Sequence, residues 1–178
     1  MKTILLTGAS GRIGRCLRFA LRDDYYLILF NRSTIEDLGP TERLIRGDTT
    51  DASAVEAAAI GVDAIVDMAA VSDEASFREK LLPSNMLGTY NVFEAARANH
   101  VPRVIYASTH HVIGYYPAEQ RLDVHVPYRP SARCTPSRSV LLRPRDDCTL
   151  TRQVSRSSVF VSASSRIVHL RSGTSRSG

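Results

Sequence analysis

The sequence predicts an α/β protein with a doubly wound parallel sheet. Short apolar runs with little alternation, of which residues 1–7 are the first, are typical of strands buried on both faces of such a sheet. A glycine-rich turn follows this run, and helical patterns then alternate with apolar runs in units of about 25 residues, which implies right-handed crossovers. We expect one domain over residues 1–130, with a sheet that is incomplete at its C-terminal side.

Five strands and four helices are expected along the domain. The strands are predicted at residues 1–7, 25–30, 44–48, 63–68 and 103–107. The helices are predicted at residues 13–23, 51–59, 77–82 and 84–98, the last two separated by Pro83 because proline breaks an α-helix. In the first helix, the core side is expected to carry Ile13, Cys16, Leu17, Ala20 and Leu21. The arginines between them are expected to face solvent: Arg12, Arg15, Arg18 and Arg22.

The basic charge of the chain is confined to its C-terminal part. The net charge is +5, but residues 1–130 hold 14 basic and 16 acidic residues, a net of −2, and residues 131–178 hold 9 Arg and 2 Asp, a net of +7. The domain itself therefore gives no sign of a nucleic-acid partner. No apolar run reaches 18 residues, so we expect a cytoplasmic protein with no membrane partner. Cys16, Cys134 and Cys148 show no ligand spacing, and we expect reduced thiols and no metal site.

Residues 131–178 differ in composition from the rest of the chain. They contain 12 Ser and 9 Arg and no sustained period of two or 3.6 residues, which predicts disorder. An alternative is a basic tail that binds nucleic acid through its phosphates. That alternative lacks the usual interleaved aromatic side chains, since Phe160 is the only aromatic residue after Tyr128.

The glycine-rich turn predicts a Rossmann-type site for NAD or NADP. Gly8, Gly11 and Gly14 lie between an apolar strand and a helix, so the backbone can approach a diphosphate closely and the helix N-terminus offers free N–H groups. The residues between the glycines that are expected to contact the dinucleotide are Ser10, Arg12 and Ile13. The alternative is a turn that uses glycine for steric reasons alone.

The end of the second strand bears on the choice between the two coenzymes. An Asp or Glu here would accept hydrogen bonds from the ribose hydroxyls of NAD, but the sequence has Asn31, Arg32 and Ser33. Arg32 with Ser33 can instead hold a 2′-phosphate, which favours NADP; the alternative is a solvated surface arginine. Asp48 and Thr49 are both expected to contact the coenzyme. Asp48 is expected to accept from the adenine amino group, and the alternative is that it caps the following helix.

Several further segments resemble the extended short-chain dehydrogenase/reductases, also called the NAD-dependent epimerase/dehydratase family. They are residues 7–14, 63–70 and 85–96, and residues 106–117 are more particularly similar to the uronate dehydrogenases and their sugar-epimerase-like relatives. The resemblance covers residues 1 to about 130. It implies an oxidoreductase that passes a hydride between nicotinamide and a carbon of a sugar or sugar acid, and a homodimer for intact relatives.

The resemblance also implies roles for individual residues. Thr109 takes the place of the catalytic Ser or Thr that hydrogen-bonds the reacting oxygen. The nicotinamide side of the site is expected to be lined by Met68, Ala69, Ala70, Val71 and Asn85. The substrate is expected to contact Ser72, Ser108, His110 and His111. For the two histidines, ordinary loop hydrogen bonding is an equal alternative.

One part of the family pattern is missing. In such enzymes a Tyr exchanges the proton, and a Lys four residues later lowers the pKa of that Tyr. No Tyr here has a Lys at that spacing, and the only lysines are Lys2 and Lys80. The pair is expected soon after residues 126–130, where the Ser/Arg-rich segment begins instead. The chain is therefore expected to be inactive as written, or alternatively to be a catalytically silent dinucleotide-binding regulator.

We interpret the change of composition as the result of a shifted reading frame. In the shifted frame, each new codon consists of the last base of one residue's codon and the first two bases of the next residue's codon. Read in this way, residues 134–139 permit Leu-Tyr-Ala-Val-Thr-Lys, which contains the missing Tyr-x-x-x-Lys pair. Residues 146–152 and 158–163 likewise permit family-like segments in the proper order. The alternative is a genuinely divergent tail. An out-of-frame tail would leave a sheet edge uncovered, which predicts marginal stability.

Overall fold

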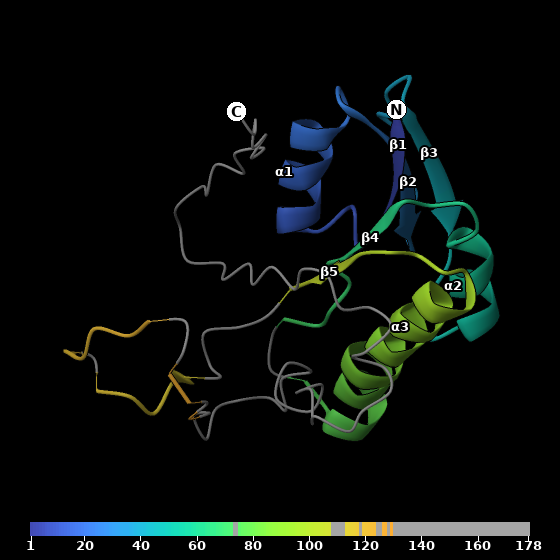
Figure 1. Ribbon diagram of the computed structural model, residues 1–178. Coiled ribbons are helices and arrows are strands. Elements are labelled where there is room, and N and C mark those ends of the chain that lie inside the picture. Colours follow the sequence, from blue (N-terminus) through green and yellow to red (C-terminus); the bar gives the residue numbers. More distant parts are fainter. Residues whose placement is uncertain (73–74, 108–112, 118, 124–125, 128, 130–178) are drawn as a thin grey trace, which may run out of the picture.

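A computed structural model of the protein describes residues 1–72, 75–107, 113–117, 119–123, 126–127 and 129. Five parallel strands form one sheet in the order β3-β2-β1-β4-β5. Their bounds are β1 Lys2–Thr7, β2 Tyr25–Asn31, β3 Glu42–Arg46, β4 Ala64–Asp67 and β5 Val104–Tyr106. Helix α1 (Arg12–Leu21) covers one face, and α2 (Ala52–Ala58) and α3 (Gly88–Ala98) cover the other (Figure 1). The doubly wound parallel sheet predicted from the sequence is confirmed.

The central strand explains why the sheet can be covered on both faces. In β1, Ile4 and Leu6 pack on the face of α1, and Leu5 packs on the face of α2 and α3. The face of α1 also buries Leu27, Leu29 and Val66, and the opposite face buries Phe30, Val55, Ile65 and Val92. Burial of one such side chain contributes about 1.5–3 kcal/mol, so both layers stabilise the sheet.

The predicted break at Pro83 is wrong. A π-helix, η1 (Phe77–Leu87), passes through Pro83 and leads directly into α3. In an α-helix the proline ring would crowd the carbonyl four residues earlier, whereas π-helical N–H groups pair with carbonyls five residues earlier. The N–H of Gly88 donates to the carbonyl of Pro83 in this pattern. The proline is therefore accommodated by a change of helix type.

The predicted orientation of the first helix is only partly correct. Leu17 and Leu21 pack on the sheet as expected, but Ile13, Cys16 and Ala20 are exposed. Arg18, expected in solvent, is 2% exposed. The reason lies at Gly14, where a Cβ would lie 2.2 Å from the carbonyl oxygen of Gly8. This close packing orients the helix so that the side of Gly14 and Arg18 faces inward.

Two kinds of feature are absent from the described part of the chain. No helix there is long and apolar enough to cross a bilayer. Nor does that part hold a group of three or more His, Cys, Asp or Glu side chains arranged to bind a metal ion.

Candidate nucleotide-binding site

The glycine turn between β1 and α1 is closed too tightly at Gly8 for any other residue. Gly8 has φ +64°, and a Cβ there would lie 2.8 Å from the backbone nitrogen of Ala69. The N–H of Gly11 donates to the carbonyl of Gly8 at 3.0 Å. The turn therefore brings its backbone against the segment that follows β4, and no side chain separates them.

The N-terminus of α1 offers its amide groups at this turn. Its N-cap residue is Gly11, which has no side chain to occupy them, and none of the residues of its first turn, all of them described, is acidic. The first N–H groups of a helix have no partner within the helix and carry a partial positive charge. Arg12, Ile13 and Gly14 supply these groups, so the turn fits a diphosphate by its shape and by its electrostatics.

A cleft of about 200 Å³ lies at the carboxyl ends of β1, β2 and β4, where the glycine turn forms one wall. Most residues predicted to bind the dinucleotide line it: Gly8, Ser10, Gly11, Asn31, Arg32, Ser33, Asp48, Thr49, Met68, Ala69, Ala70 and Val71. The cleft is also lined by Phe30, Gly47 and Ser84, which the sequence reasoning missed. The sequence signal at this position was the glycine itself, and the structure gives the reason for it: a Cβ at Gly47 would lie 2.4 Å from the ring of Phe30.

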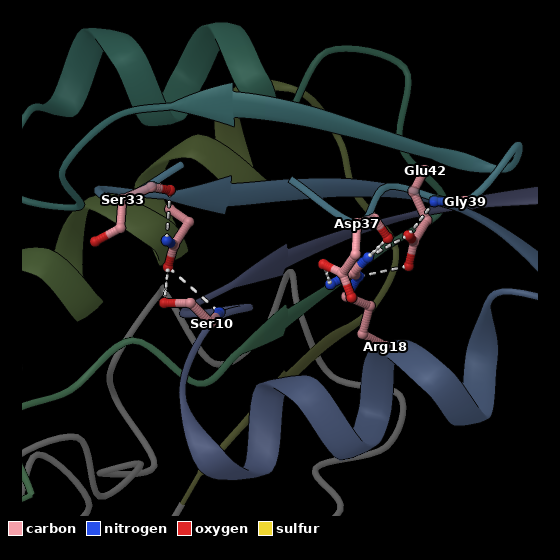
Figure 2. Close-up of polar contacts among 7 residues, drawn as sticks. Ser10, Arg18, Ser33, Asp37, Gly39 and Glu42 are labelled. Carbon is pink, nitrogen blue, oxygen red and sulfur yellow. Dashed lines mark hydrogen bonds and ion pairs between the residues drawn. The ribbon is translucent and has the colours of Figure 1, made fainter. Parts of the chain in front are cut away.

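Asn31 connects the glycine turn to the segment after β2. Its side-chain oxygen accepts a hydrogen bond from the hydroxyl of Ser10 at 3.0 Å, and its side-chain nitrogen donates to the carbonyl of Ser33 at 2.8 Å (Figure 2). The residue is buried. Both ends of the amide are thus engaged within the protein, and Asn31 holds the cleft wall together.

Arg32 is the cationic side chain at this end of the cleft. Its side chain is 71% exposed and lies 3.7 Å from a carboxylate oxygen of Asp48. Asp48 also accepts two hydrogen bonds from Thr50, each 3.0 Å long, through its backbone N–H and its hydroxyl. An exposed ion pair of this length contributes about 0–1 kcal/mol. The guanidinium can therefore leave Asp48 for a stronger anionic partner at little cost.

Thr7 fixes the opposite wall of the cleft. Its hydroxyl donates to a carboxylate oxygen of Asp67 at 2.6 Å and accepts from the N–H groups of Met68 and Ala69 at 3.1 and 3.0 Å. Thr7 and Asp67 are paired across β1 and β4 and are both buried. Polar residues at the ends of two apolar strands were the sequence signal for this contact, which the sequence reasoning did not use.

A known protein family matches most of this chain. Residues 4–171 match the NAD dependent epimerase/dehydratase family. The chain belongs to this family. The resemblance noted from the sequence motifs is thereby confirmed.

Among members of the epimerase/dehydratase family, uronate dehydrogenases are similar to this chain. The enzyme from Agrobacterium fabrum is 43% identical over 131 residues, which are 73% of this chain and 49% of the relative. The enzyme from Pseudomonas putida is 41% identical over 133 residues, or 72% and 48% of the two chains. The crystal structure of uronate dehydrogenase from Agrobacterium tumefaciens has a TM-score of 0.68 at 44% identity, covering 73% of this chain and 49% of that one. The chain spans about half the length of these relatives.

The remaining predicted residues of this epimerase/dehydratase chain lie away from the cleft lining or outside the described residues. Asn85 does not line the cleft, but its side chain accepts from the N–H of Val71 at 2.8 Å and donates to the carbonyl of Val71 at 3.0 Å. It therefore supports the wall from behind. Ser72 is exposed beside that wall. The positions outside the described residues are Ser108, Thr109, His110 and His111.

Proposed function

We propose that residues 1–130 are the coenzyme-binding part of a dehydrogenase that acts on a sugar acid of the uronate type. The observation that carries this proposal is the glycine turn, in which Gly8 packs on the backbone of Ala69 and α1 presents its first amides to a cleft. The similarity to uronate dehydrogenases supports the substrate class. A mutant of the Agrobacterium tumefaciens enzyme has been crystallised in complex with NAD, which supports a dinucleotide as the ligand.

The residues of the cleft suggest how a dinucleotide would lie in it. The diphosphate would meet the amides at Gly11 and the first turn of α1, and the adenosine ribose would meet Arg32 and Ser33. The nicotinamide ring would lie along the segment from Met68 to Val71. When bound, the ring supplies the carbon that gives or takes a hydride. The protein contributes the binding, the orientation and the shape of the wall.

We infer a preference for NADP over NAD. The side chain at the end of β2 is the amide of Asn31, which is engaged by Ser10 and Ser33, so this position offers no carboxylate to the two ribose hydroxyls. Arg32 is exposed at the same end, and among the described residues it is held only by a long ion pair to Asp48. A 2′-phosphate would offer this guanidinium shorter, charge-assisted hydrogen bonds.

Hydride transfer is not proposed for the 178 residues by themselves. Thr109 is proposed to hydrogen-bond the reacting oxygen, and Ser72, Ser108, His110 and His111 are proposed to contact the sugar. None of these groups replaces a Tyr whose pKa is lowered by a Lys, and that pair is missing from the sequence.

We propose that a reading-frame shift in residues 131–178 accounts for the absence of the Tyr-x-x-x-Lys pair. Sequencing the gene around codons 130–135 tests this. If an insertion or deletion is found there and the corrected frame encodes Tyr-x-x-x-Lys, the shift is supported. If no insertion or deletion is found there, the shift is contradicted.

Titration calorimetry tests the proposed function. The 178-residue protein, first shown to be folded by circular dichroism, is titrated with NADPH and with NADH. We expect binding in the micromolar range, tighter for NADPH. Absence of heat with both coenzymes on folded protein contradicts the proposal, and equal affinity contradicts only the preference for NADP.

A further inference from the structure

Arg18 forms a buried ionic cluster on the inner side of α1. Its Nε and Nη2 atoms donate to the two carboxylate oxygens of Glu42, both at 2.7 Å. Its Nη1 atom donates to the carboxylate of Asp37 at 2.9 Å, and Nη2 also donates to the carbonyl of Asp37 at 2.5 Å (Figure 2). The side chains of Arg18 and Glu42 are 2% and 0% exposed, and that of Asp37 is 65% exposed.

The cluster fixes the far half of the loop between β2 and β3. Glu42 also accepts from the N–H of Gly39 at 2.7 Å, so the carboxylate that holds Arg18 closes the end of the loop. Ile35 is buried in the core beneath α1. Thr41 donates its hydroxyl to the carbonyl of Arg22 at 2.6 Å. Residues 35–42 are therefore attached to α1 at several points.

The near end of the same loop forms a wall of the cleft. Arg32 and Ser33 line the cleft, and only a few residues separate them from Asp37. The chain between Ser33 and Asp37 is short, so the position of Asp37 limits the positions that Ser33 can take. Figure 2 shows the two groups of contacts side by side above α1: Ser10 and Ser33 at one end, and Arg18 with Asp37 at the other.

We propose that Arg18 is a positioning residue for coenzyme binding, which holds the β2–β3 loop so that Arg32 and Ser33 face the adenosine ribose. Helix α1 begins at the phosphate turn and carries Arg18 two turns later. One rigid helix thus sets the position of the phosphate turn relative to the ribose loop. This inference rests on the proposed function, because it assumes that the cleft binds a dinucleotide.

The chemistry of the cluster points to a role beyond stability. Replacing a buried ion pair by well-packed apolar side chains is often neutral or stabilising, so burial of these charges is not needed for the core. A guanidinium, with its planar fork of donors, can bind a carboxylate on β3 and a loop carbonyl at the same time. Burial by itself raises the pKa of Glu42, but the hydrogen bonds from Arg18 and Gly39 outweigh it and leave the pKa below its ordinary value. Arg18 and Glu42 therefore remain charged at neutral pH.

The test compares two ligands that differ only in the 2′-phosphate, ADP-ribose and 2′-phospho-ADP-ribose. Calorimetry is carried out on the wild type, Arg18→Met, Asp37→Asn and the control Arg97→Met, which removes an exposed arginine of α3. Asp37→Asn keeps the Arg18–Glu42 contact and changes an exposed side chain, so it is expected to fold. We expect Kd for the 2′-phosphorylated ligand to rise about tenfold in Arg18→Met and about threefold in Asp37→Asn, with a smaller change for ADP-ribose.

The outcomes separate this inference from the proposed function. If Arg18 has a purely structural role, Arg18→Met lowers the melting temperature, but the folded protein keeps the wild-type ratio of the two Kd values. That result overturns the inference. If Arg18→Met does not fold, an unchanged Kd ratio in Asp37→Asn overturns it equally. If the wild type binds neither ligand nor either coenzyme, the proposed function fails and the inference fails with it.

Discussion

The hydroxyl of Thr7 and the carboxylate of Asp67 form a 2.6 Å hydrogen bond that joins the carboxyl ends of β1 and β4. The same hydroxyl accepts from the backbone of Met68 and Ala69. One buried atom thus serves three groups at the wall of the cleft. Its removal is expected to be costly, because a buried polar group that loses its partner keeps its desolvation penalty.

The variant Thr7→Val removes this atom while keeping the shape of the side chain. We expect the free energy of unfolding to fall by about 2–4 kcal/mol, measured by urea denaturation. Thr3→Val makes the same change on the same strand, near the surface, and is expected to cost less than about 1 kcal/mol. Equal effects of the two substitutions would mean that the Thr7 contacts do not stabilise the strand ends.

A second prediction concerns the phosphate turn. Gly11 has φ −68°, which any residue adopts, and Asp is a better N-cap than Gly. The variant Gly11→Asp is therefore expected to fold while placing a negative charge where a diphosphate would lie. We expect Kd for NADPH to rise at least tenfold.

The control for this charge effect is Gly11→Ala. It adds the same Cβ, which lies 3.2 Å from the carbonyl oxygen of Gly8, without adding a charge. We expect a smaller loss of affinity than with Asp. A folded Gly11→Asp protein that binds NADPH as tightly as the wild type would place the diphosphate elsewhere.

A third prediction separates the two coenzymes. Arg32→Gln removes the exposed cation at the end of β2 and is expected to raise Kd for NADPH about tenfold, with Kd for NADH changed less than twofold. Arg103→Gln removes an exposed arginine before β5, at the opposite edge of the sheet, and is expected to change neither value. The measurement is calorimetric titration at fixed ionic strength. Parallel losses for both coenzymes in Arg32→Gln would argue against contact with a 2′-phosphate.

A fourth prediction concerns pH. The hydrogen bond from Arg18 lowers the pKa of Asp37 below its ordinary value of 3.8. Because the folded-state pKa is depressed, its contribution to stability is fully present above pH 3.8 and is lost as the pH falls through the folded-state pKa. The difference in melting temperature between wild type and Asp37→Asn should therefore shrink as the pH is lowered from 6 to 3. Asp24→Asn, an exposed change after α1, is the control. A difference that is constant with pH would mean that the Asp37 charge does not stabilise the fold.

The sheet and the glycine turn were predictable because their signals are local. Apolar runs such as residues 1–7 identify buried strands, and the spacing of Gly8, Gly11 and Gly14 identifies a tight turn, in which Gly8 and Gly14 have no room for a Cβ. The parallel pairing of the strands follows from the same α/β alternation. The lining of the cleft was largely predictable as well, because the carboxyl ends of parallel strands meet at one edge.

The errors arose where distant residues decide the outcome. Arg18 was assigned to solvent because its periodicity was judged on α1 alone, whereas its partners, Asp37 and Glu42, lie on the following loop and strand. Pro83 was expected to break a helix because only the α-helical pattern was considered. Whether Thr109 and its neighbours take part in catalysis stays a prediction.

The order β3-β2-β1-β4-β5 has a consequence for how such a chain can change its ligand. From β1 the chain winds outward to one side through α1, and the later strands are added on the other side, so the connections diverge at β1. The opening between these connections results from the path of the backbone and does not depend on which side chains are present. Selectivity then resides in short surface segments at its rim, and exchanging one of these segments can redirect recognition while the architecture beneath remains the same.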